Sequence, residues 1–494
     1  MRLSDLIQGL LPPLERLAFD PDIKRVTENS KKADVNSIFV CIRGANTDGH
    51  RYADSAYANG CRVFIGQADL ALPADALYVR VEDPRRVLAL LACRIADMPS
   101  QKLHVIGITG PKGKTTTAQL LAHILNQCGP PCAYIGTSGI SYANVHIATK
   151  NTTPDAVTLQ ETLSEIRKAG IQTVVMEVSS QAMLQSRVDG IHFRTLIFTN
   201  LSPDHIGENE HPDFENYKAC KHRLFTDFDS ESVIFNADDP ASCDMLRDCP
   251  AKIRISCSET DRRADFRIGA VTLLRDTHMW GVSCNVFAKN TSSSDKLELP
   301  LIGRFNAKNA LLALATAHRV FGIQVSNACY ALRTAAVEGR SELIPLPNGA
   351  CAVIDYAHNR ASMESLLRSL REYAPRRLIA LFGSVGERSQ MRRRELGEVA
   401  ASLCDLCILT SDNPGTEPPE QIIHEIAEAF VSSPVPCLKI PDRAEAIRHA
   451  ISVTQSGDIL ALAGKGHETY QLIGKEKLPF CEREILLDAI KILK

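Results

Sequence analysis

"GITGPKGKTTTAQ", residues 107–119, joins the apolar run LHV to the helical-looking LLAHILNQ. An apolar run, a glycine-rich turn and a helical period in this order predict a strand, a loop and a helix. Glycines let backbone N–H groups approach phosphate oxygens beside the positive N-terminal end of a helix. The stretch therefore predicts a phosphate-binding loop at the carboxyl end of a buried strand.

The residues of this loop suit a nucleoside triphosphate. Lys114 would reach the β- and γ-phosphates, and the Thr115 hydroxyl would face Mg²⁺. The spacing is shorter than the strict GxxxxGK[ST] pattern, because Ile108 stands where that pattern has its first glycine. A chance glycine turn is the alternative, and the strand, the GK[ST] residues and the helix together disfavour it. The candidate ATP-binding residues of the loop are Gly110, Gly113, Lys114, Thr115 and Thr116.

Outward from the loop, short apolar runs alternate with helical periods, as in parallel α/β sheets. Two series of central strands are predicted, namely HVIGIT, TVVMEVS, TLIFTNL and SVIFNADD in the first, and RLIALFG, DLCILTSD and DILALAGKG in the second. Pro and Gly cluster between the series. We therefore expect an α/β protein with a small N-terminal α/β domain (1–99), a central P-loop ATPase-like parallel-sheet domain (100–336) and a C-terminal α/β domain (337–494).

Composition narrows the function classes. The chain has 494 residues, 45% hydrophobic and 23% charged, with a formal net charge of -2. The sequence has no excess of basic residues that would indicate binding of nucleic acid. It also has no long apolar segment that would indicate a membrane span, and its first residues lack the pattern of a signal peptide. We expect a cytoplasmic monomer. Most of the 16 cysteines should be reduced thiols, and the CxxC at Cys404 and Cys407 favours packing over zinc or redox chemistry.

Five segments together carry a family resemblance: GITGPKGKTTT, MEVSSQA, FTNLSPDH, DYAHN, and DNPG followed by AGKGHE. In this order, over nearly the whole chain, they resemble the Mur ligase family, and within it the UDP-N-acetylmuramoyl-tripeptide synthetases. The resemblance implies an N-terminal domain that binds the UDP-muramoyl substrate, a central ATPase domain and a C-terminal Rossmann-like domain that binds the amino acid.

The resemblance also implies a reaction. ATP would phosphorylate the free D-Glu side-chain carboxylate of UDP-N-acetylmuramoyl-L-alanyl-D-glutamate, and the amino group of a free diamino acid would displace the phosphate. An acyl phosphate has the good leaving group that a carboxylate lacks. Because no protein nucleophile is required, catalysis should rest on positioning and charge neutralisation by cations and Mg²⁺ ligands.

Three further residues match the family's catalytic positions. Glu177 ends the run TVVME and suits Mg²⁺, which prefers oxygen ligands. His205, beside Asp204, resembles a ligand of a second Mg²⁺, and Lys221 resembles the family's carbamylated lysine, whose carbamate would supply oxygens. Taken singly, each could be an ordinary solvated side chain. The resulting catalytic set is Lys114, Glu177, His205 and Lys221, and the metal set is Thr115, Glu177, His205 and Lys221.

Other motif matches imply which residues bind ATP and which bind the UDP substrate. Asn306 resembles the family's adenine-contacting position, Arg340 would neutralise phosphate, and Asp355 would accept from the ribose hydroxyls. A plain strand and its exit turn is the alternative for the DYAHN segment. In the N-terminal domain, Lys31 stands where the family usually has Arg, which weakens the assignments there. The full sets are Asn306, Arg340, Asp355, Tyr356 and His358 for ATP, and Ser30, Thr152, Thr153, Ser179 and Arg187 for the UDP substrate.

The amino acid is decided in the last domain. Diaminopimelate-adding members carry DNPR, and this sequence has Gly415 in place of that Arg. Arg388 would hold the α-carboxylate and Glu468 a distal ammonium. This charge pattern ranks L-lysine slightly ahead of meso-2,6-diaminopimelate. The predicted amino-acid set is Arg388, Asp412, Asn413, Gly464 and Glu468.

Two other functions compete with this prediction. A folylpolyglutamate synthetase-like ligase would share the ATPase and C-terminal domains, but the extra N-terminal domain and the EVSSQA segment disfavour it. A catalytically silent paralogue would bind nucleotide and UDP-muramoyl peptide without turnover. Release of ADP on addition of the UDP-muramoyl dipeptide and an amino acid would separate a ligase from a silent binder.

Overall fold

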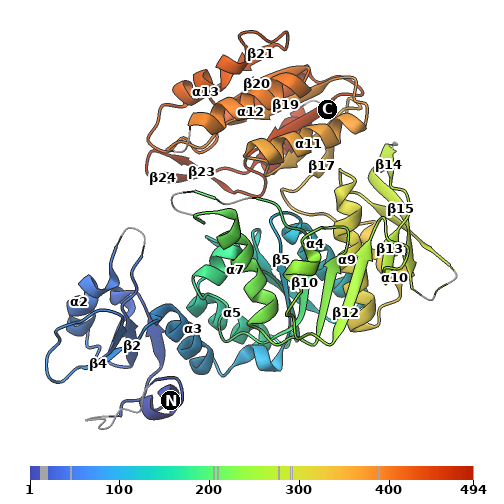
Figure 1. Ribbon diagram of the computed structural model, residues 1–494. Helices are drawn as coiled ribbons and strands as arrows, with labels where there is room; N and C mark the ends of the chain where they lie inside the picture. Colours follow the sequence, from blue (N-terminus) through green and yellow to red (C-terminus); the bar gives the residue numbers. More distant parts are fainter. Residues whose placement is uncertain are drawn as a thin grey trace. The chain divides into compact units, whose positions relative to one another are not determined.

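The computed structural model describes residues 1–11, 20–44, 47–203, 206–207, 211–275, 279–289, 291, 293–387 and 390–492 (Figure 1). The chain forms two compact units. Unit 1 comprises Met1–Asp265 and Ala315–Gly322, and unit 2 comprises Phe266–Leu314 and Ile323–Lys494. Among the described residues, none of the helices has the length and apolar character needed to cross a bilayer.

Unit 1 begins with a four-stranded parallel sheet in the order β1-β2-β3-β4. Its core packs apolar residues of α1 and α3 against the strands. Asp83 caps α3 by accepting a hydrogen bond from the Arg86 N–H, and Pro84 occupies the first helical position, where its missing N–H costs nothing. The elements are α1 (Leu3–Ile7), β1 (Arg25–Thr27), η1 (Ser30–Lys32), β2 (Ser37–Val40), η2 (Gly49–Tyr52), α2 (Ala53–Ala58), β3 (Val63–Gly66), β4 (Leu77–Arg80), α3 (Pro84–Ile95) and η3 (Pro99–Lys102).

The larger sheet of unit 1 contains the strand-loop-helix unit predicted from residues 107–119. Its strands follow the order β12-β11-β10-β5-β9-β6-β7-β8, parallel from β12 to β6 and antiparallel at β7 and β8. The elements are β5 (His104–Thr109), α4 (Lys114–Cys128), β6 (Cys132–Gly136), β7 (Gly139–Tyr142), β8 (Val145–Ile147), α5 (Ala156–Lys168), β9 (Thr173–Glu177), α6 (Ser180–Leu184), β10 (Phe193–Phe198), α7 (Phe214–Thr226), β11 (Ser232–Asn236), α8 (Ser242–Met245) and β12 (Ile253–Ser258).

Both faces of this sheet are covered, which explains why its strands are continuous apolar runs. One face packs against buried residues of α5, α6, α7 and α8, and α4 contacts β5, β6 and β9. The carboxyl ends of parallel neighbours meet at one edge. The segments that follow β5, β9 and β10 are therefore brought together in space, although they lie far apart in the sequence.

Unit 2 contains a smaller antiparallel group of strands and a second α/β sheet. In the first group β15 pairs with β13, β14 and β16. Arg275 on β14 donates to the Tyr373 and Ala374 carbonyls at 2.5 and 2.6 Å, which fastens this group to the end of α11. The first elements are β13 (Phe266–Ile268), β14 (Thr272–Arg275), β15 (Trp280–Ala288), β16 (Asp295–Leu299), α9 (Phe305–Phe321), whose residues from Ala315 on belong to unit 1, and α10 (Val325–Leu332).

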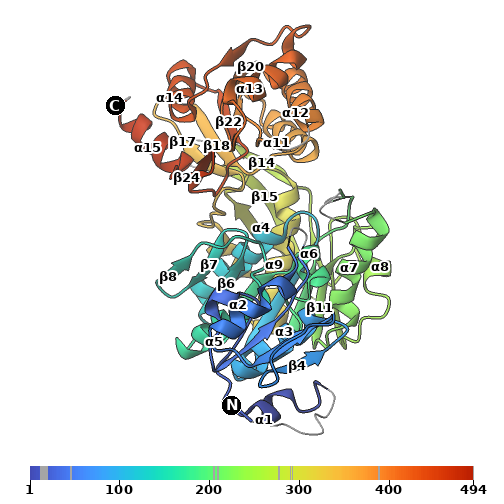
Figure 2. The same ribbon diagram turned by 90° about the vertical axis from the view of Figure 1, so that its left-hand side faces the viewer.

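The second sheet of unit 2 has the order β17-β18-β22-β19-β20-β21, with only β17 antiparallel to its neighbour among these described strands. Figure 2 shows α14 and α15 on one side of it and α11, α12 and α13 on the other, in agreement with two separate apolar cores. The elements are β17 (Glu342–Pro345), β18 (Cys351–Asp355), α11 (Arg360–Glu372), β19 (Leu378–Phe382), α12 (Gln390–Leu403), β20 (Leu406–Leu409), α13 (Pro419–Ala427), η4 (Glu428–Phe430), β21 (Cys437–Lys439), α14 (Arg443–Val453), β22 (Ile459–Ala463), β23 (Tyr470–Ile473), β24 (Glu476–Pro479) and α15 (Glu482–Ile492).

The α/β fold class predicted from the sequence is confirmed, including parallel sheets at the predicted strand runs. Cys404 and Cys407 lie in the apolar core under α11 and α12, as their packing role predicted. All 16 cysteines are free thiols. The residue numbers at which the three domains begin and end stay a prediction.

Candidate active site

The phosphate loop has the backbone geometry that its glycines predict. Gly110 and Gly113 have φ values of +145° and +83°, which side chains disfavour. A Cβ atom at Gly110 would lie 2.0 Å from the Thr199 Oγ1 atom. Only glycine lets the loop pass this close to the segment after β10. Both the lack of room for a Cβ atom and the positive φ therefore require glycine at position 110.

The segment after β10 holds the loop in place through hydrogen bonds. Thr199 Oγ1 and Asn200 Nδ2 donate to the Lys112 carbonyl at 2.7 and 2.8 Å. Lys114 begins α4, and its ammonium folds back to donate to the Gly110 and Pro111 carbonyls at 2.7 and 3.2 Å. The predicted Thr115 and Thr116 are buried in the first turn of α4. The N-terminal end of the helix and a lysine ammonium thus lie in one loop, which suits an anionic phosphate.

Glu177 is fully buried at the carboxyl end of β9 and accepts four hydrogen bonds. Its Oε2 atom accepts from the Thr115 and Thr137 hydroxyls at 3.0 and 3.2 Å, and Oε1 accepts from the Tyr134 hydroxyl and the Thr137 N–H at 2.7 and 2.9 Å. Burial, followed by the charge of Glu177, raises the pKa of Tyr134 well above its ordinary value. The carboxylate is therefore held in one orientation against the phosphate loop.

Four predicted acceptor residues gather at the same strand end. Thr153 Oγ1 donates to the Glu177 carbonyl at 2.9 Å and accepts from the Ser179 N–H at 3.1 Å. Arg187 donates to the Thr153 carbonyl at 2.8 Å. The Thr152 hydroxyl lies 3.1 Å from that of Thr137, which also donates to Glu177. The structure therefore brings Thr152, Thr153, Ser179 and Arg187 together with Glu177.

Ser30, the acceptor residue predicted in the N-terminal sheet region, is buried at the start of η1, and its carbonyl accepts from Asn59. Glu28, two residues before Ser30, was not among the site residues predicted from the sequence. Burial raises the pKa of Glu28, and the positive charges of Arg85 and Arg187 oppose that effect. The positive charge of Arg187 therefore acts on the Glu28 carboxyl group, which follows β1 in the first sheet of unit 1.

Lys221 is 1% exposed on α7, with its Nζ atom 4.7 Å from the centre of the Tyr217 ring. The Tyr217 ring packs edge-on against His211, whose ring nitrogens lie 2.8 Å from Ser180 Oγ and 2.8 Å from Asn216 Oδ1. Ser180 follows Glu177 by three residues. A polar chain therefore connects the end of β9 to the helix that carries Lys221. The predicted His205 and its neighbour Asp204 lie outside the described residues.

The predicted nucleotide residues of unit 2 cluster at the end of β18. The Arg340 guanidinium lies 5.0 Å from the centre of the Tyr356 ring, and His358 packs against the same ring. Asp355 accepts from the Ser341 N–H at 2.7 Å; burial raises its pKa and Arg340 opposes that effect. Asn306 is buried, and its amide donates to the Ile302 carbonyl at 2.7 Å.

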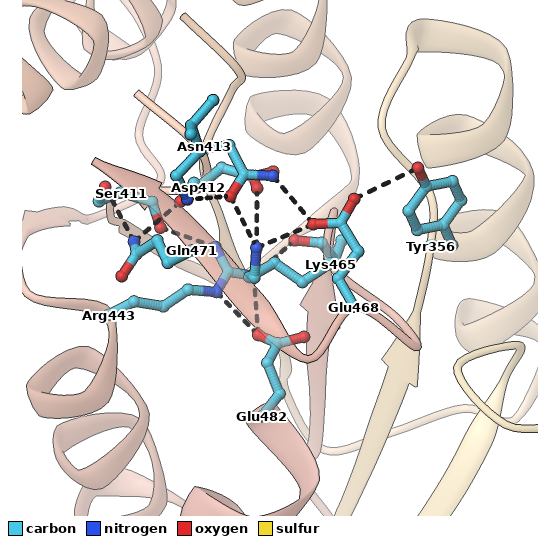
Figure 3. Close-up of polar contacts among 11 residues, drawn as sticks. Tyr356, Ser411, Asp412, Asn413, Arg443, Lys465, Glu468, Gln471 and Glu482 are labelled. Carbon is cyan, nitrogen blue, oxygen red and sulfur yellow. Dashed lines mark hydrogen bonds and ion pairs between the residues drawn. The ribbon is translucent and has the colours of Figure 1, made fainter. Parts of the chain in front are cut away.

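The predicted amino-acid residues surround a lysine that sequence reasoning missed (Figure 3). Lys465 is fully buried, and its ammonium donates to Asn413 Oδ1 at 3.0 Å and Glu468 Oε2 at 2.9 Å. It lies 3.6 Å from Asp412 Oδ1. A Cβ atom at Gly464 would come within 2.7 Å of Asp412 Oδ2. Asp412, Asn413, Gly464 and Glu468 therefore form one cluster, and Arg388 lies outside the described residues.

Gly415 has φ +60°, and a Cβ atom there would lie 3.1 Å from Glu387 Oε1. Thr416 fixes that carboxylate, because its hydroxyl donates to Glu387 at 2.6 Å and its N–H donates at 3.2 Å. These hydrogen bonds lower the pKa of Glu387. Position 415 therefore has an ionised carboxylate beside it and no guanidinium of its own.

The residues that sequence reasoning missed act through contacts between distant segments. Tyr134 reaches Glu177 because β6 pairs with β9. Lys465 had a usable signal, since a lysine directly after the apolar run ILALAG is a candidate buried charge. Within the described residues, no group of three or more His, Cys, Asp or Glu side chains is arranged to hold a metal.

Family models match most of the chain. The Mur ligase family catalytic domain matches residues 22–95, the Mur ligase middle domain 108–317, and the Mur ligase glutamate ligase domain 339–466. A UDP-N-acetylmuramoyl-L-alanyl-D-glutamate--2,6-diaminopimelate ligase of Caldanaerobacter subterraneus is 36% identical over 490 residues, covering 99% of both chains. The chain belongs to the Mur ligase family.

Two further relatives agree with this assignment to the Mur ligases. The enzyme of the same name from Haemophilus influenzae strain 86-028NP is 35% identical over 97% of this chain and 98% of its own. A solved structure of a ligase of that name superposes with a TM-score of 0.71 at 28% identity, covering 100% and 99% of the two chains. The prediction of an ATP-dependent ligase of the tripeptide-synthetase type is confirmed. The named relatives add diaminopimelate, so they favour that alternative over the lysine ranking.

Proposed function

We propose that this Mur ligase uses ATP to join a free diamino acid to the D-Glu carboxylate of UDP-N-acetylmuramoyl-L-alanyl-D-glutamate. One observation carries the proposal. Glu177 accepts from Thr115 of the phosphate loop through its carboxylate and from Thr153 of the predicted acceptor segment through its carbonyl. The predicted nucleotide and acceptor residues of unit 1 therefore share one site, as transfer of a phosphoryl group between their ligands requires.

In this reaction the acceptor carboxylate attacks the γ-phosphorus of ATP and ADP leaves. The amine of the diamino acid then forms the amide bond and displaces phosphate. Lys114 and the N–H groups at the start of α4 would neutralise the charge of the transferring group. Arg187 and the hydroxyls of Thr152 and Thr153 would orient the acceptor. Each of these groups acts by binding and positioning, and no residue needs to form a covalent bond with substrate.

Magnesium fits the oxygen-only donor set at the phosphate loop. The Thr115 hydroxyl and the Glu177 carboxylate lie 3.0 Å apart beside the loop, and both are hard oxygen donors of the kind that Mg²⁺ prefers. We infer that these two residues hold the ion together with phosphate oxygens. When bound, it would supply positive charge to the phosphates.

We also infer that Lys221 carries a carbamate. Its amine would bond to the carbon of CO₂ with loss of a proton, which replaces a cation by an anionic pair of oxygens. The burial of Lys221 beside the Tyr217 ring supports this proposal, because a buried lysine that bears oxygen ligands can serve a metal whereas an ammonium opposes it. His205, outside the described residues, stays the predicted ligand of a second Mg²⁺.

For the amino acid we propose 2,6-diaminopimelate, which the names of the full-length relatives support. L-lysine is the second candidate, because Gly415 lacks a guanidinium and Glu387 places a carboxylate beside it. Asp412 and Glu468 carry two negative charges against the one positive charge of Lys465. This excess suits the distal ammonium that both amino acids have.

The test is amino-acid-dependent release of ADP with UDP-N-acetylmuramoyl-L-alanyl-D-glutamate, with the product identified by mass spectrometry. We expect turnover with 2,6-diaminopimelate that exceeds turnover with L-lysine, and none without an amino acid. A reversed preference would select the second candidate. Activity only with a folate and glutamate, or no ADP release with any diamino acid, would overturn the proposed function.

Gly415→Arg tests how the pocket treats a second carboxylate. We expect the kcat/KM ratio of diaminopimelate to lysine to rise about tenfold, because a charge-assisted hydrogen bond contributes about 1.5–3 kcal/mol. Two effects keep the increase in this ratio near the lower end of the range that the hydrogen bond allows. Arginine must adopt a φ near +60°, which costs about 1 kcal/mol, and the Glu387 carboxylate competes for its guanidinium.

Gly415→Gln is the matched control, because glutamine has the same backbone strain without the charge. It should leave the ratio of the two amino acids unchanged. If the wild type prefers diaminopimelate and Gly415→Arg leaves the ratio unchanged, another residue holds the second carboxylate.

A further inference from the structure

A fully buried arginine lies behind the amino-acid cluster. Arg443 begins α14 and donates through NH1 to the Ser411 carbonyl at 3.1 Å and through NH2 to the Ala463 carbonyl at 2.9 Å. These are the last residues before Asp412 and Gly464. The Arg443 guanidinium therefore bonds to the backbone of both segments that carry the predicted amino-acid residues, in addition to the direct hydrogen bonds of Asn413 with Lys465 and Glu468.

The strands that lead into these segments are not neighbours. Ser411 follows β20 and Ala463 ends β22, while the sheet order places β19 between them. No ladder of hydrogen bonds can fix the distance from one segment to the other beyond the end of β19. The planar guanidinium can, because its donors point in several fixed directions at once. Figure 3 shows Arg443 and Glu482 beside the cluster around Lys465.

Glu482 holds the guanidinium in place. It begins α15, is fully buried, and its Oε1 atom lies 2.8 Å from both Nε and NH2 of Arg443. Its Oε2 atom is buried and has no hydrogen-bond partner in the part of the chain that the structure describes. Breaking such a pair leaves an uncompensated buried charge, which is costly. Three carboxylates (Asp412, Glu468, Glu482) and two cations (Lys465, Arg443) then leave the cluster with one excess negative charge.

We propose that Arg443 is a positioning residue for the amino acid and that Glu482 is its orienting charge partner. The inference rests on the proposed function. Arg443 holds the Ser411 backbone to that of Ala463 and so supports the side-chain contacts between the two segments, and Glu482 keeps the net charge of the cluster negative. The pair thereby determines the affinity for the diamino acid without contacting it.

The first test is Arg443→Lys. A lysine ammonium keeps the positive charge but cannot span both carbonyls and Glu482 with fixed directions. We expect the KM for the amino acid to rise about 10- to 100-fold, because displacement of Asp412 or Glu468 would remove a hydrogen bond between one of these carboxylates and the charged amino acid. The KM for the UDP substrate should stay within about twofold, because its predicted residues belong to unit 1. The KM for ATP should rise less than that for the amino acid, although Tyr356 of the predicted ATP set contacts Glu468.

Arg377→Lys is the matched control. Arg377 also pairs with a fully buried carboxylate, that of Asp458, and also donates to a backbone carbonyl, that of Val453, at 2.8 Å. It lies at the opposite, amino-terminal end of β19 and β22. The Arg377→Lys variant should therefore have a lower melting temperature without a selective change in the KM for the amino acid. Equal rises in all three KM values for Arg443→Lys, or no rise, would overturn the positioning role.

Glu482→Gln separates charge from geometry. The amide keeps an acceptor for Arg443 but removes one negative charge, so we expect a selective rise in the KM for the amino acid that is smaller than that of Arg443→Lys. If both variants are unfolded in thermal melts, the pair is a folding requirement and the proposal is wrong. Failure of the proposed function would look different, because the wild-type enzyme itself would then show no turnover dependent on a diamino acid.

Discussion

Lys114→Ala is expected to remove nearly all ADP release while UDP-substrate binding stays measurable. The ammonium lies in the phosphate loop at the start of α4, where it would neutralise charge on the transferring phosphoryl group. Loss of one preorganised group of this kind raises the barrier by about 3–4 kcal/mol, or roughly 100- to 1,000-fold in kcat. Steady-state ADP release and calorimetric binding of the UDP substrate measure the two effects separately.

Lys112→Ala provides the matched control for this prediction. Lys112 is exposed in the same loop, and its known contacts to Thr199 and Asn200 are made by its backbone, which alanine keeps. The control should therefore retain most activity. Near-normal ADP release by a folded Lys114→Ala variant would show that this loop does not hold the transferring phosphate.

The phosphate loop could be predicted from sequence because every part of its signal is local. The apolar strand, the glycines and the GK[ST] residues lie within 16 residues, 104–119, and the positive φ values of Gly110 and Gly113 follow from the same stretch. The parallel sheets were equally accessible, since strands covered on both faces are continuous apolar runs. Strand ends were less accurate: the predicted run SVIFNADD (232–239) ends as a strand at Asn236.

The surroundings of the site could not be predicted because they depend on which strands are neighbours. Tyr134 reaches Glu177 only because β6 lies beside β9, and Arg443 joins β20 to β22 only because β19 separates them. Neither fact has a pattern in the one-dimensional chain. The motif residues Thr152, Thr153, Ser179 and Arg187 were found singly. Thr153 is hydrogen-bonded to Ser179, Arg187 and Glu177, and Thr152 pairs with Thr137, which also donates to Glu177, so these contacts explain why the residues occur together.

Lys221→Ala is expected to be almost inactive, with a loss of about 100-fold or more in kcat, because the oxygens that a carbamate would offer to a metal are removed. Lys221 is 1% exposed beside Tyr217, so the side chain is enclosed and not solvated. Short carboxylic acids such as formate, acetate and propionate should partly restore turnover, because each can place two oxygens in the space that the lysine side chain leaves.

Lys218→Ala is the control on the same helix. Lys218 pairs with Asp244 at 3.1 Å on the surface, and its loss should leave kcat and the response to acetate unchanged. A thermal melt of both variants separates loss of chemistry from loss of folding, and rescue by acid gives a readout that a purely structural lysine cannot produce. Rescue should also saturate with acid concentration and fail with amines of similar size, since only a carboxylate reproduces the charge. A folded Lys221→Ala enzyme that retains most activity and ignores added acids would mean that Lys221 carries no catalytic carbamate.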